Sequence, residues 1–568
     1  MASLPPQPSG AWAPGAPRLA RPASLGEPWR WSVVVLAVIV ASFAVTLTSG
    51  NPVNAAGFSL LGRFVSAALK PALDAQTLEL IVKSSGVTLT IATCGTAVSV
   101  LIGTFAGLWA SETWWALLGF DTQGTRVWRR PVFWVRAFLA VPRGVPEIVW
   151  GLFLINVLGL DCWVAVLAIG IPFGAITAKV FSEHIDETPR RAAVAYRAAG
   201  AGAINAFFYG IWPTVSPSLV AYACYRFECA IRSAAVLGLI GASGLGYQIM
   251  LSLDTLRYAE VWSFLYALIV IVAASDWLSS RVTGILQKQI APTAEELRKQ
   301  TRTMTMVLAG AAIASVAAYS ALELELARLC EPRRILMLRD VLVASWPPKV
   351  RLDELPGIVG LATQTVAMSI AAITIASCLA IGTSWIATPR LWIAHRTAAR
   401  SWEWLAARVT AAAVRLGLVA VRSLSDGIWV LLALFVFYPG PFAGAVALGV
   451  YNFGVMGRLL VQLNEVADTK PYSALRAQGA GALGGIAYGF LPTLLPQYLA
   501  YALYRWEVCV RATMVVGIVA AGGLGRRLQD QMVSFDYRGV AATLIGYIVL
   551  TVVVDTISGE ARRALRAS

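Results

Sequence analysis

Two segments of the chain carry the pattern Arg-x-Glu-x-x-x-Arg inside otherwise apolar runs. The residues are Arg226, Glu228 and Arg232 in the first segment, and Arg505, Glu507 and Arg511 in the second. In a helix, Glu228 and Arg232 share one face because they are four residues apart, whereas Arg226 points roughly the opposite way. A charge at bilayer depth costs about 3 to more than 10 kcal/mol unless it is paired or faces water. If these segments cross a membrane, the six side chains need partners or a ligand.

Two interpretations of the pattern stay open. In one, the glutamate and the second arginine neutralise each other and fix helix packing. In the other, an arginine lines a central cavity and offers a planar fork of donors to a tetrahedral oxyanion. Arg226 and Arg505 are the stronger candidates for anion binding, because no acidic neighbour lies on their own helix face. We assign all six residues to a substrate pathway as a hypothesis.

These charged segments belong to a long internal duplication. Residues 195–246 and 474–525 align without a gap at an offset of 279, and about 25 of the 52 positions are identical. The same offset pairs Arg143 with Arg422 and Asp276 with Asp555, which extends the repeat to roughly 84–280 and 363–559. The chain therefore reads as a tandem fusion of two homologous units.

The composition places both units in a membrane. The chain has 568 residues, of which 58% are hydrophobic and only 14% charged, and its mean hydropathy is +0.67. Soluble proteins carry about 25% charged residues. The seven cysteines show no CxxC pair and the two histidines no cluster, so no metal site is expected.

Apolar runs long enough to cross a bilayer predict six spans in each unit. The expected spans are 31–47, 84–108, 132–158, 162–181, 213–240 and 261–280, then 303–322, 361–387, 411–437, 441–461, 492–520 and 540–558. The predicted organisation is a disordered tail over 1–29, a first unit over 30–283, a linker over 284–302 and a second unit over 303–568.

Arginine and lysine residues gather in alternate loops, which indicates the cytoplasmic side. Because each unit has an even number of spans, both termini are predicted to be cytoplasmic and the two units to lie parallel. The net charge of +15 is explained by this loop bias and not by a nucleic-acid surface. The fold expected is an all-α membrane protein of two parallel six-helix domains, with about 12 transmembrane helices.

A cytoplasmic loop rich in small residues precedes the fifth span of each unit. Its shared positions are Ala195, Arg197, Ala198 and Gly200 in the first unit, and Ala474, Arg476, Ala477 and Gly479 in the second. Small side chains on a short helix let a partner approach its backbone closely. The alternative is an interfacial helix that lies passively on the membrane, which the second matching copy disfavours.

The loop, with its A-x-R-A-x-G pattern and a following proline, resembles the cytoplasmic coupling loop of type I ABC-transporter permeases. The segments YRFECAIRSAAVLGLIGASGLG and YRWEVCVRATMVVGIVAAGGLG, together with RGVPEIVW at 143–150, are similar to the signatures of phosphonate and phosphite permeases. The chain departs from that family at Val194 and Ser473, where an acidic residue is usual, and in RSLSDGIW of the second unit, although Asp426 keeps the charge of Glu147.

The resemblance implies a permease of the bacterial inner membrane that imports a phosphonate, phosphite or related oxyanion. It implies two copies of a cytosolic ABC ATPase that use ATP and Mg, an extracytoplasmic solute-binding protein, and surrounding lipid as partners. The chain itself lacks G-x-x-x-x-G-K-[ST], so we expect it to be a permease without enzymatic activity or a cofactor of its own. A type I permease for methionine or an inorganic oxyanion, an ion-coupled secondary transporter and a membrane scaffold without transport remain alternatives.

Glycines follow the fifth span of each unit, at Gly244, Gly246, Gly523 and Gly525. Glycine permits tight turns with positive φ. These residues are predicted to form either a mobile outer gate or a close-packed turn.

Overall fold

The computed structural model describes residues 28–48, 53–54, 57–119, 131–286, 294–322, 329, 331–349, 354–389 and 401–567. In these residues the regular elements are helices, and one isolated antiparallel bridge joins Val53 to Phe437. Most of the tail expected over 1–29 lies outside the described residues. The all-α prediction is confirmed for the described chain.

The first half begins with two helices that precede the repeat and continues through the repeated core. Its helices are α1 (Pro28–Leu47), α2 (Gly57–Ala67), α3 (Ala75–Ala110), α4 (Glu112–Leu117), α5 (Pro131–Gly144), α6 (Glu147–Leu158), α7 (Cys162–Glu187), α8 (Arg191–Ala198), α9 (Ala203–Gly210), α10 (Trp212–Leu239), α11 (Leu245–Asp254) and α12 (Tyr258–Leu286).

The second half follows the same order. Its helices are α13 (Ala294–Ala321), α15 (Pro332–Ala344), α16 (Leu355–Ile386), α18 (Ser401–Ser423), α19 (Asp426–Val436), α20 (Pro441–Val466), α21 (Lys470–Ala477), α22 (Ala482–Gly485), η3 (Ile486–Phe490), α23 (Leu491–Val516), η4 (Gly517–Ala521), α24 (Gly523–Val533) and α25 (Tyr537–Ala567). Helices α7 and α20, like α8 and α21, begin and end at positions 279 residues apart. The duplication in sequence is therefore a duplication of helices.

The predicted spans fall on helices, but hydropathy alone identifies fewer than twelve. Eight described helices are long and apolar enough to cross a membrane, and two bent pairs raise the number to ten. One of these pairs is α5 with α6, which meet at an angle of 84°, so the span expected over 132–158 is broken in its middle. The other two expected spans correspond to α1, whose apolar part is short, and to α10, which contains three charged residues.

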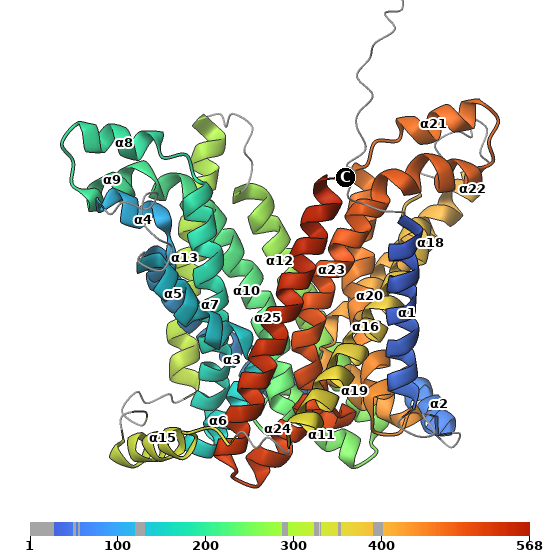
Figure 1. Cartoon of the computed structure of the whole chain (residues 1–568), viewed down its shortest axis with the longest axis horizontal. Helices are drawn as coiled ribbons and strands as arrows, with labels where there is room; N and C mark the ends of the chain where they lie inside the picture. The colour runs from blue at the N-terminus through green and yellow to red at the C-terminus, as the bar shows by residue number, and fades with distance from the viewer. Residues whose placement is uncertain are drawn as a thin grey trace, which may run out of the picture.

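The two halves lie with the same direction across the molecule. Figure 1 shows α8 and α9 at the upper left and α21 and α22 at the upper right, so the loops that match in sequence occupy the same end. Helices α6, α11, α15 and α24 lie at the opposite end. This arrangement is the parallel one that an even number of spans per unit predicts.

The helix that precedes each core packs on the other half. Helix α1 contacts α16 and α20 of the second half, and α13 contacts α3 of the first half. In Figure 1, α1 accordingly lies beside the helices of the second half at the right, while α13 lies at the left. The boundaries expected between the two units, at residues 283 and 303, stay predictions. Parts of the expected linker over 284–302 are helical, because α12 continues to Leu286 and α13 begins at Ala294.

Close backbone contacts define the turn after α10. Gly244 has a φ of +83°, and a Cβ atom at Gly246 would lie 1.9 Å from the carbonyl oxygen of Ala235 on α10. The turn is also tied to α3, because the backbone amide of Leu245 donates to Thr88 Oγ1 at 2.9 Å. In the second half, the amide of Leu524 donates to Thr365 Oγ1 at 3.1 Å. These contacts describe a close-packed turn, and the gate assignment of its glycines stays a prediction.

We expect Gly246→Ala to destabilise the protein by at least about 1–3 kcal/mol, the usual cost of overpacking, because the added methyl collides with backbone. Gly284→Ala is the matched control, since a Cβ there meets nothing within 4 Å. Melting of the detergent-solubilised chain measures both. Equal melting temperatures for Gly246→Ala and the unmodified chain would show that α10 and α11 are not held this closely.

Candidate functional site

Glu228 and Arg232 form the ion pair that their spacing predicts. Arg232 Nη2 lies 2.9 Å from Glu228 Oε1; the Glu228 side chain is buried and that of Arg232 is only 12% exposed. Glu228 also binds Arg422 of the second half, whose Nη1 is 3.4 Å from the same oxygen. The pair is thus part of a contact between the halves.

Asp276 on α12 extends this contact. Its Oδ2 lies 3.0 Å from Arg422 Nη2 and 2.8 Å from Arg458 Nη1. Arg422 lies in the last turn of α18 and Arg458 lies on α20, so one carboxylate of the first half binds two helices of the second. We call Glu228, Arg232, Asp276, Arg422 and Arg458 the cross-half network.

The equivalent residues of the second half pair differently. Arg511 Nη2 binds Glu507 at 2.8 Å and Asp555 at 3.2 Å, and Arg562 Nη2 binds Glu507 at 3.1 Å. All four residues belong to α23 or α25 of the same half. The duplicated charges therefore form one network that bridges the halves and one that stays within a half.

Arg143 and Arg422 occupy equivalent positions but differ in their contacts. Arg422 makes the two ion pairs described above, whereas Arg143 makes no hydrogen bond or ion pair to any described residue. Arg143 is half-buried at the end of α5, immediately before the bend into α6. Glu147, which begins α6, accepts a hydrogen bond from Ser233 Oγ at 2.6 Å and ties this half-helix to α10.

Arg226 and Arg505 also have different surroundings. The Arg226 guanidinium carbon lies 3.6 Å from the centre of the Phe173 ring, and its Nε and Nη2 atoms are buried without a hydrogen-bond partner. Asn452 occupies the position equivalent to Phe173, and its Oδ1 accepts from both Nε and Nη2 of Arg505. Both arginines face a helix of their own half, α7 or α20. Their place in the substrate pathway remains a prediction.

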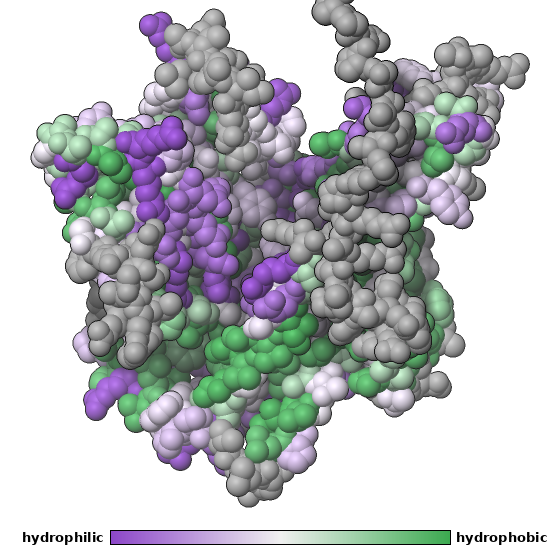
Figure 2. All heavy atoms as spheres, turned by 45° about the horizontal axis from the view of Figure 1, so that its top comes forward, coloured by the Kyte–Doolittle hydropathy of each residue, from purple (hydrophilic) through white to green (hydrophobic). Residues whose placement is uncertain are grey.

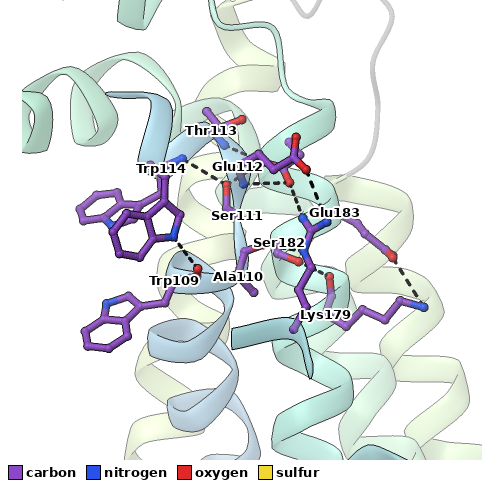
Figure 3. A network of polar contacts seen from close by, with 12 residues as sticks. Trp109, Ala110, Ser111, Glu112, Thr113, Trp114, Lys179, Ser182 and Glu183 are labelled. Carbon is purple, nitrogen blue, oxygen red and sulfur yellow. Dashed lines mark hydrogen bonds and ion pairs between the residues drawn. The ribbon is translucent and has the colours of Figure 1, made fainter. Parts of the chain in front are cut away.

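The end of the first half nearest α8 is held by Asp186. Its carboxylate accepts hydrogen bonds from Ser111 Oγ at 2.7 Å, from the amide of Thr113 at 2.9 Å and from Arg136 Nη2 at 3.0 Å. Figure 3 shows Ser111, Glu112 and Thr113, at the turn between α3 and α4, close to Ser182 and Glu183 of α7. The pair Arg415 and Glu465 repeats the ion pair in the second half, at 2.6 Å. This repeated contact fixes the helices from which the loops at 195 and 474 extend.

The arginine and glycine of each loop form a helix end. The amide of Ala201 donates to the carbonyl of Tyr196 and the amide of Gly200 to that of Arg197, which is the hydrogen-bond pattern of a Schellman motif. Gly200 has a φ of +90° and Gly479 of +91°, and a Cβ at either position would meet nothing within 4 Å. The positive φ at the end of each loop helix therefore explains why Gly200 and Gly479 are glycines.

Arg197 closes this turn, because its Nη1 donates to the carbonyl of Ala201 at 3.0 Å, and Arg476 does the same to Ala480 at 2.7 Å. The loop surface around the turn is exposed and partly apolar. Tyr209 is 69% exposed, and its equivalent Tyr488 is 82% exposed. The two loops therefore present matching exposed surfaces at one end of the molecule.

A cavity of about 560 Å³ opens beside α23 in the second half. Its lining residues are Leu463, Pro496, Gln497, Ala500, Tyr501, Tyr504 and Arg562. Figure 2, in which the upper end of Figure 1 is turned forward, shows hydrophilic residues gathered in the middle of the face and hydrophobic residues below them. On this face a polar region therefore lies above an apolar one.

Sequence reasoning did not assign Arg143, Arg422, Arg458, Asp276 or Asp555 to the site. The repeat pairs Arg143 with Arg422 and Asp276 with Asp555, so the signal for four of them was present. Arg458 has Lys179 as its equivalent, and Lys179 pairs instead with Glu183 at 3.7 Å. The long apolar helices define the class as a polytopic membrane protein.

The chain belongs to the family described as binding-protein-dependent transport system inner membrane component. The family model matches residues 124–292 and again residues 365–565, so the chain carries the type I ABC permease unit twice. No solved structure matches the chain significantly.

Three curated relatives illustrate the similarity. The chain is 26% identical over 437 residues to the phosphate-import permease protein PhnE of Mycolicibacterium smegmatis, which covers 76% of this chain and 77% of the relative. It is 34% identical over 200 residues to the phosphite transport system permease protein PtxC of Stutzerimonas stutzeri, covering 35% of this chain and 68% of the relative. It is 36% identical over 118 residues to the putative cryptic phosphonate transport system permease protein PhnE2 of Escherichia coli K12, covering 21% of this chain and 97% of the relative.

We expect Asp276→Asn to lower stability by about 1–3 kcal/mol, the usual cost of leaving a hydrogen-bonding group without its partner. Arg458 would lose its carboxylate and Arg422 one of two. Asp530→Asn is the control, because Asp530 pairs with Arg526 at the surface and such a pair contributes at most about 1 kcal/mol. Thermal unfolding in detergent compares them. If the two variants melt together, the cross-half network does not stabilise the fold.

Proposed function

We propose that this chain forms the complete membrane pathway of an ATP-driven importer for phosphate, phosphite or a phosphonate. The observation that supports this most is that the family unit occurs twice in one chain, with its matching loops at one end of the molecule. Among the buried charges, Arg226 keeps its Nε and Nη2 atoms without a hydrogen-bond partner, and guanidinium forks suit tetrahedral oxyanions. The names of the curated relatives support a phosphorus oxyanion.

The partners follow from the two loop surfaces. Two copies of a cytosolic ABC ATPase, using ATP and Mg, would bind at α8 and α21, and an extracytoplasmic solute-binding protein would dock at the opposite end. With the loops in the cytoplasm, the chain ends described at Pro28 and Ala567 would lie on the cytoplasmic side. ATP-driven approach of the two ATPases would move the loops and switch the pathway between outward and inward access.

Uptake into proteoliposomes tests the transport function. The chain, reconstituted with its ATPase and binding protein, is expected to take up radiolabelled phosphate, phosphite or methylphosphonate only when ATP is present. Sulfate and methionine serve as comparison solutes. ATP-dependent uptake of either comparison solute without uptake of any phosphorus oxyanion would contradict the proposed substrate class, and uptake driven by an ion gradient would contradict the proposed energy source.

One docking surface per half predicts that each permease chain binds two ATPase subunits. Substitutions in one loop or in both should lower that number stepwise. Ala195 and Ala474 are exposed on α8 and α21, so Ala195→Arg or Ala474→Arg places a bulky charge on one loop without breaking an internal contact. The unmodified complex should hold one permease chain and two ATPases, each variant one ATPase, and the double variant none. Native mass spectrometry counts the subunits.

Ala344→Arg is the matched control for this experiment, because Ala344 is exposed on α15 at the opposite end of the molecule. It should keep both ATPases. Complexes with two permease chains, or loop variants that retain both ATPases, would rule out one docking surface per half.

A further inference from the structure

We propose that α15 is a helix of the membrane interface, whose exposed apolar side enters the lipid and whose arginines bind the phosphate groups of anionic phospholipids. The helix lies at the end of the molecule opposite α8 and α21 and runs crosswise to the long helices (Figure 1). Its partner is lipid, whatever solute the pathway carries. The equivalent helix of the first half shows why α15 needs such a partner.

Helix α2 occupies in the first half the place of α15 in the second, because each lies between the first helix of its half and the long helix that follows, α3 or α16. Phe64 of α2 and Val343 of α15 are 279 residues apart. Phe64 is 3% exposed, and its ring packs on Trp262 of α12 at 5.0 Å and on Phe435 of α19 at 5.6 Å. Val343 is 64% exposed. A position that is buried between the halves in α2 is therefore uncovered in α15.

The missing cover follows from the sequence. At the offset of 279, Ala541 stands in place of Trp262 and Asn156 is the equivalent of Phe435. Both aromatic rings that receive α2 are thus replaced by smaller side chains on the side of α15. The apolar surface of α15 has lost its partners within the protein but has remained apolar.

Helix α15 is held to the protein by its opposite face. Arg334 Nη1 lies 3.0 Å from Asp161 Oδ2, at the start of α7, and Arg334 Nε lies 3.3 Å from Glu331 Oε2. Val341, seven residues after Arg334, is buried. This anchored face fixes which side of the helix is turned outward.

The outward side carries large apolar residues. In a helix, residues seven apart lie on one side, as Ile335 and Leu342 do, and Leu336 and Val343. Each of these four side chains is more than half exposed, and so is that of Trp346 just after the helix. A contiguous apolar surface of this kind marks a contact with a protein or with a membrane.

The position of α15 favours the membrane. Helix α13, which ends eleven residues before α15 begins, is long and apolar enough to cross a bilayer, and almost none of it is buried in the protein. Its sides therefore suit lipid. A crosswise helix that follows the end of such a span lies at the boundary between lipid and water, where amphipathic helices bury their apolar side.

The charges of α15 favour anionic headgroups. Arg339 is three or four residues from each of the four apolar helix residues above, so it lies among them. An arginine in this setting keeps its alkyl chain in the apolar layer and extends its guanidinium to the headgroups, and guanidinium forks suit phosphate. Arg333 is exposed as well, and neither arginine pairs with a residue that the structure describes. Asp340 is the single acidic residue of the helix.

Trp346 reports what covers α15 without any substitution. The unmodified chain, in nanodiscs of phosphatidylcholine and phosphatidylglycerol, is exposed briefly to hydroxyl radicals, and oxidation of Trp346 is measured by mass spectrometry against the same chain unfolded in guanidinium. Lipid cover should suppress the oxidation strongly. Oxidation at nearly the rate of the unfolded chain would contradict the proposal, because it would place Trp346 in water. Protection that appears only after the solute-binding protein is added would also contradict it, since α15 would then be a protein docking surface.

A photoactivatable phosphatidylglycerol in phosphatidylcholine nanodiscs tests the arginines. It should crosslink to residues 332–346, and unlabelled phosphatidylglycerol should compete while phosphatidylcholine does not. In the double variant Arg333→Gln with Arg339→Gln, the yield should fall roughly 10- to 30-fold, because each basic residue near an anionic surface contributes about 1 kcal/mol. Arg526→Gln is the matched control, since Arg526 is an exposed arginine on α24 at the same end, and it should keep the full yield. Equal yields in the double variant and the control, or equal competition by phosphatidylcholine, would overturn the anionic lipid site.

Discussion

The structure depends on the cost of charge inside membrane-spanning helices. Lipid offers no partner to a guanidinium or a carboxylate, so such groups are tolerated only where protein or water receives them. The chain meets this constraint by pairing Glu228 and Asp276 with Arg422 and Arg458 across the contact between its halves. Separating the halves would leave these charges without their partners. The free-energy cost of an unpaired charge therefore holds the two halves together.

The two halves keep one fold while their charged partners diverge. Helix bounds are conserved at the offset of 279 residues, as in α7 and α20, because helix length follows from apolar runs present in both copies. The partners depend on single positions: Phe173 leaves Arg226 without acceptors, whereas Asn452 supplies one to Arg505. A fused chain allows this, since a homodimer would have to place the same residue on both sides. After the duplication, the two halves thus kept the same helices while the partners of their charged side chains changed.

Much of the architecture is predictable from the sequence because it rests on local signals. Apolar runs locate the spans, the repeat gives their parallel order, and the spacing of Glu228 and Arg232 predicts their ion pair. The partners contributed by the other half could not be predicted, because no local pattern states that Arg422 lies beside Asp276. The exchange of α1 and α13 between halves is equally non-local. The role of Arg197 in closing its own helix end was hidden because an arginine in a loop is equally typical of a binding surface.

The central claim is that buried charges join the two halves directly. A double-mutant cycle on Asp276 and Arg422 measures that interaction, using Asp276→Asn, Arg422→Gln and the double variant of the full chain in thermal or denaturant unfolding. The account predicts a coupling free energy within the range of about 0.5–3 kcal/mol that contacting residues show, and the double variant should be less unstable than the sum of the single ones. Additive effects, with a coupling energy near zero, would contradict a direct ion pair between the halves.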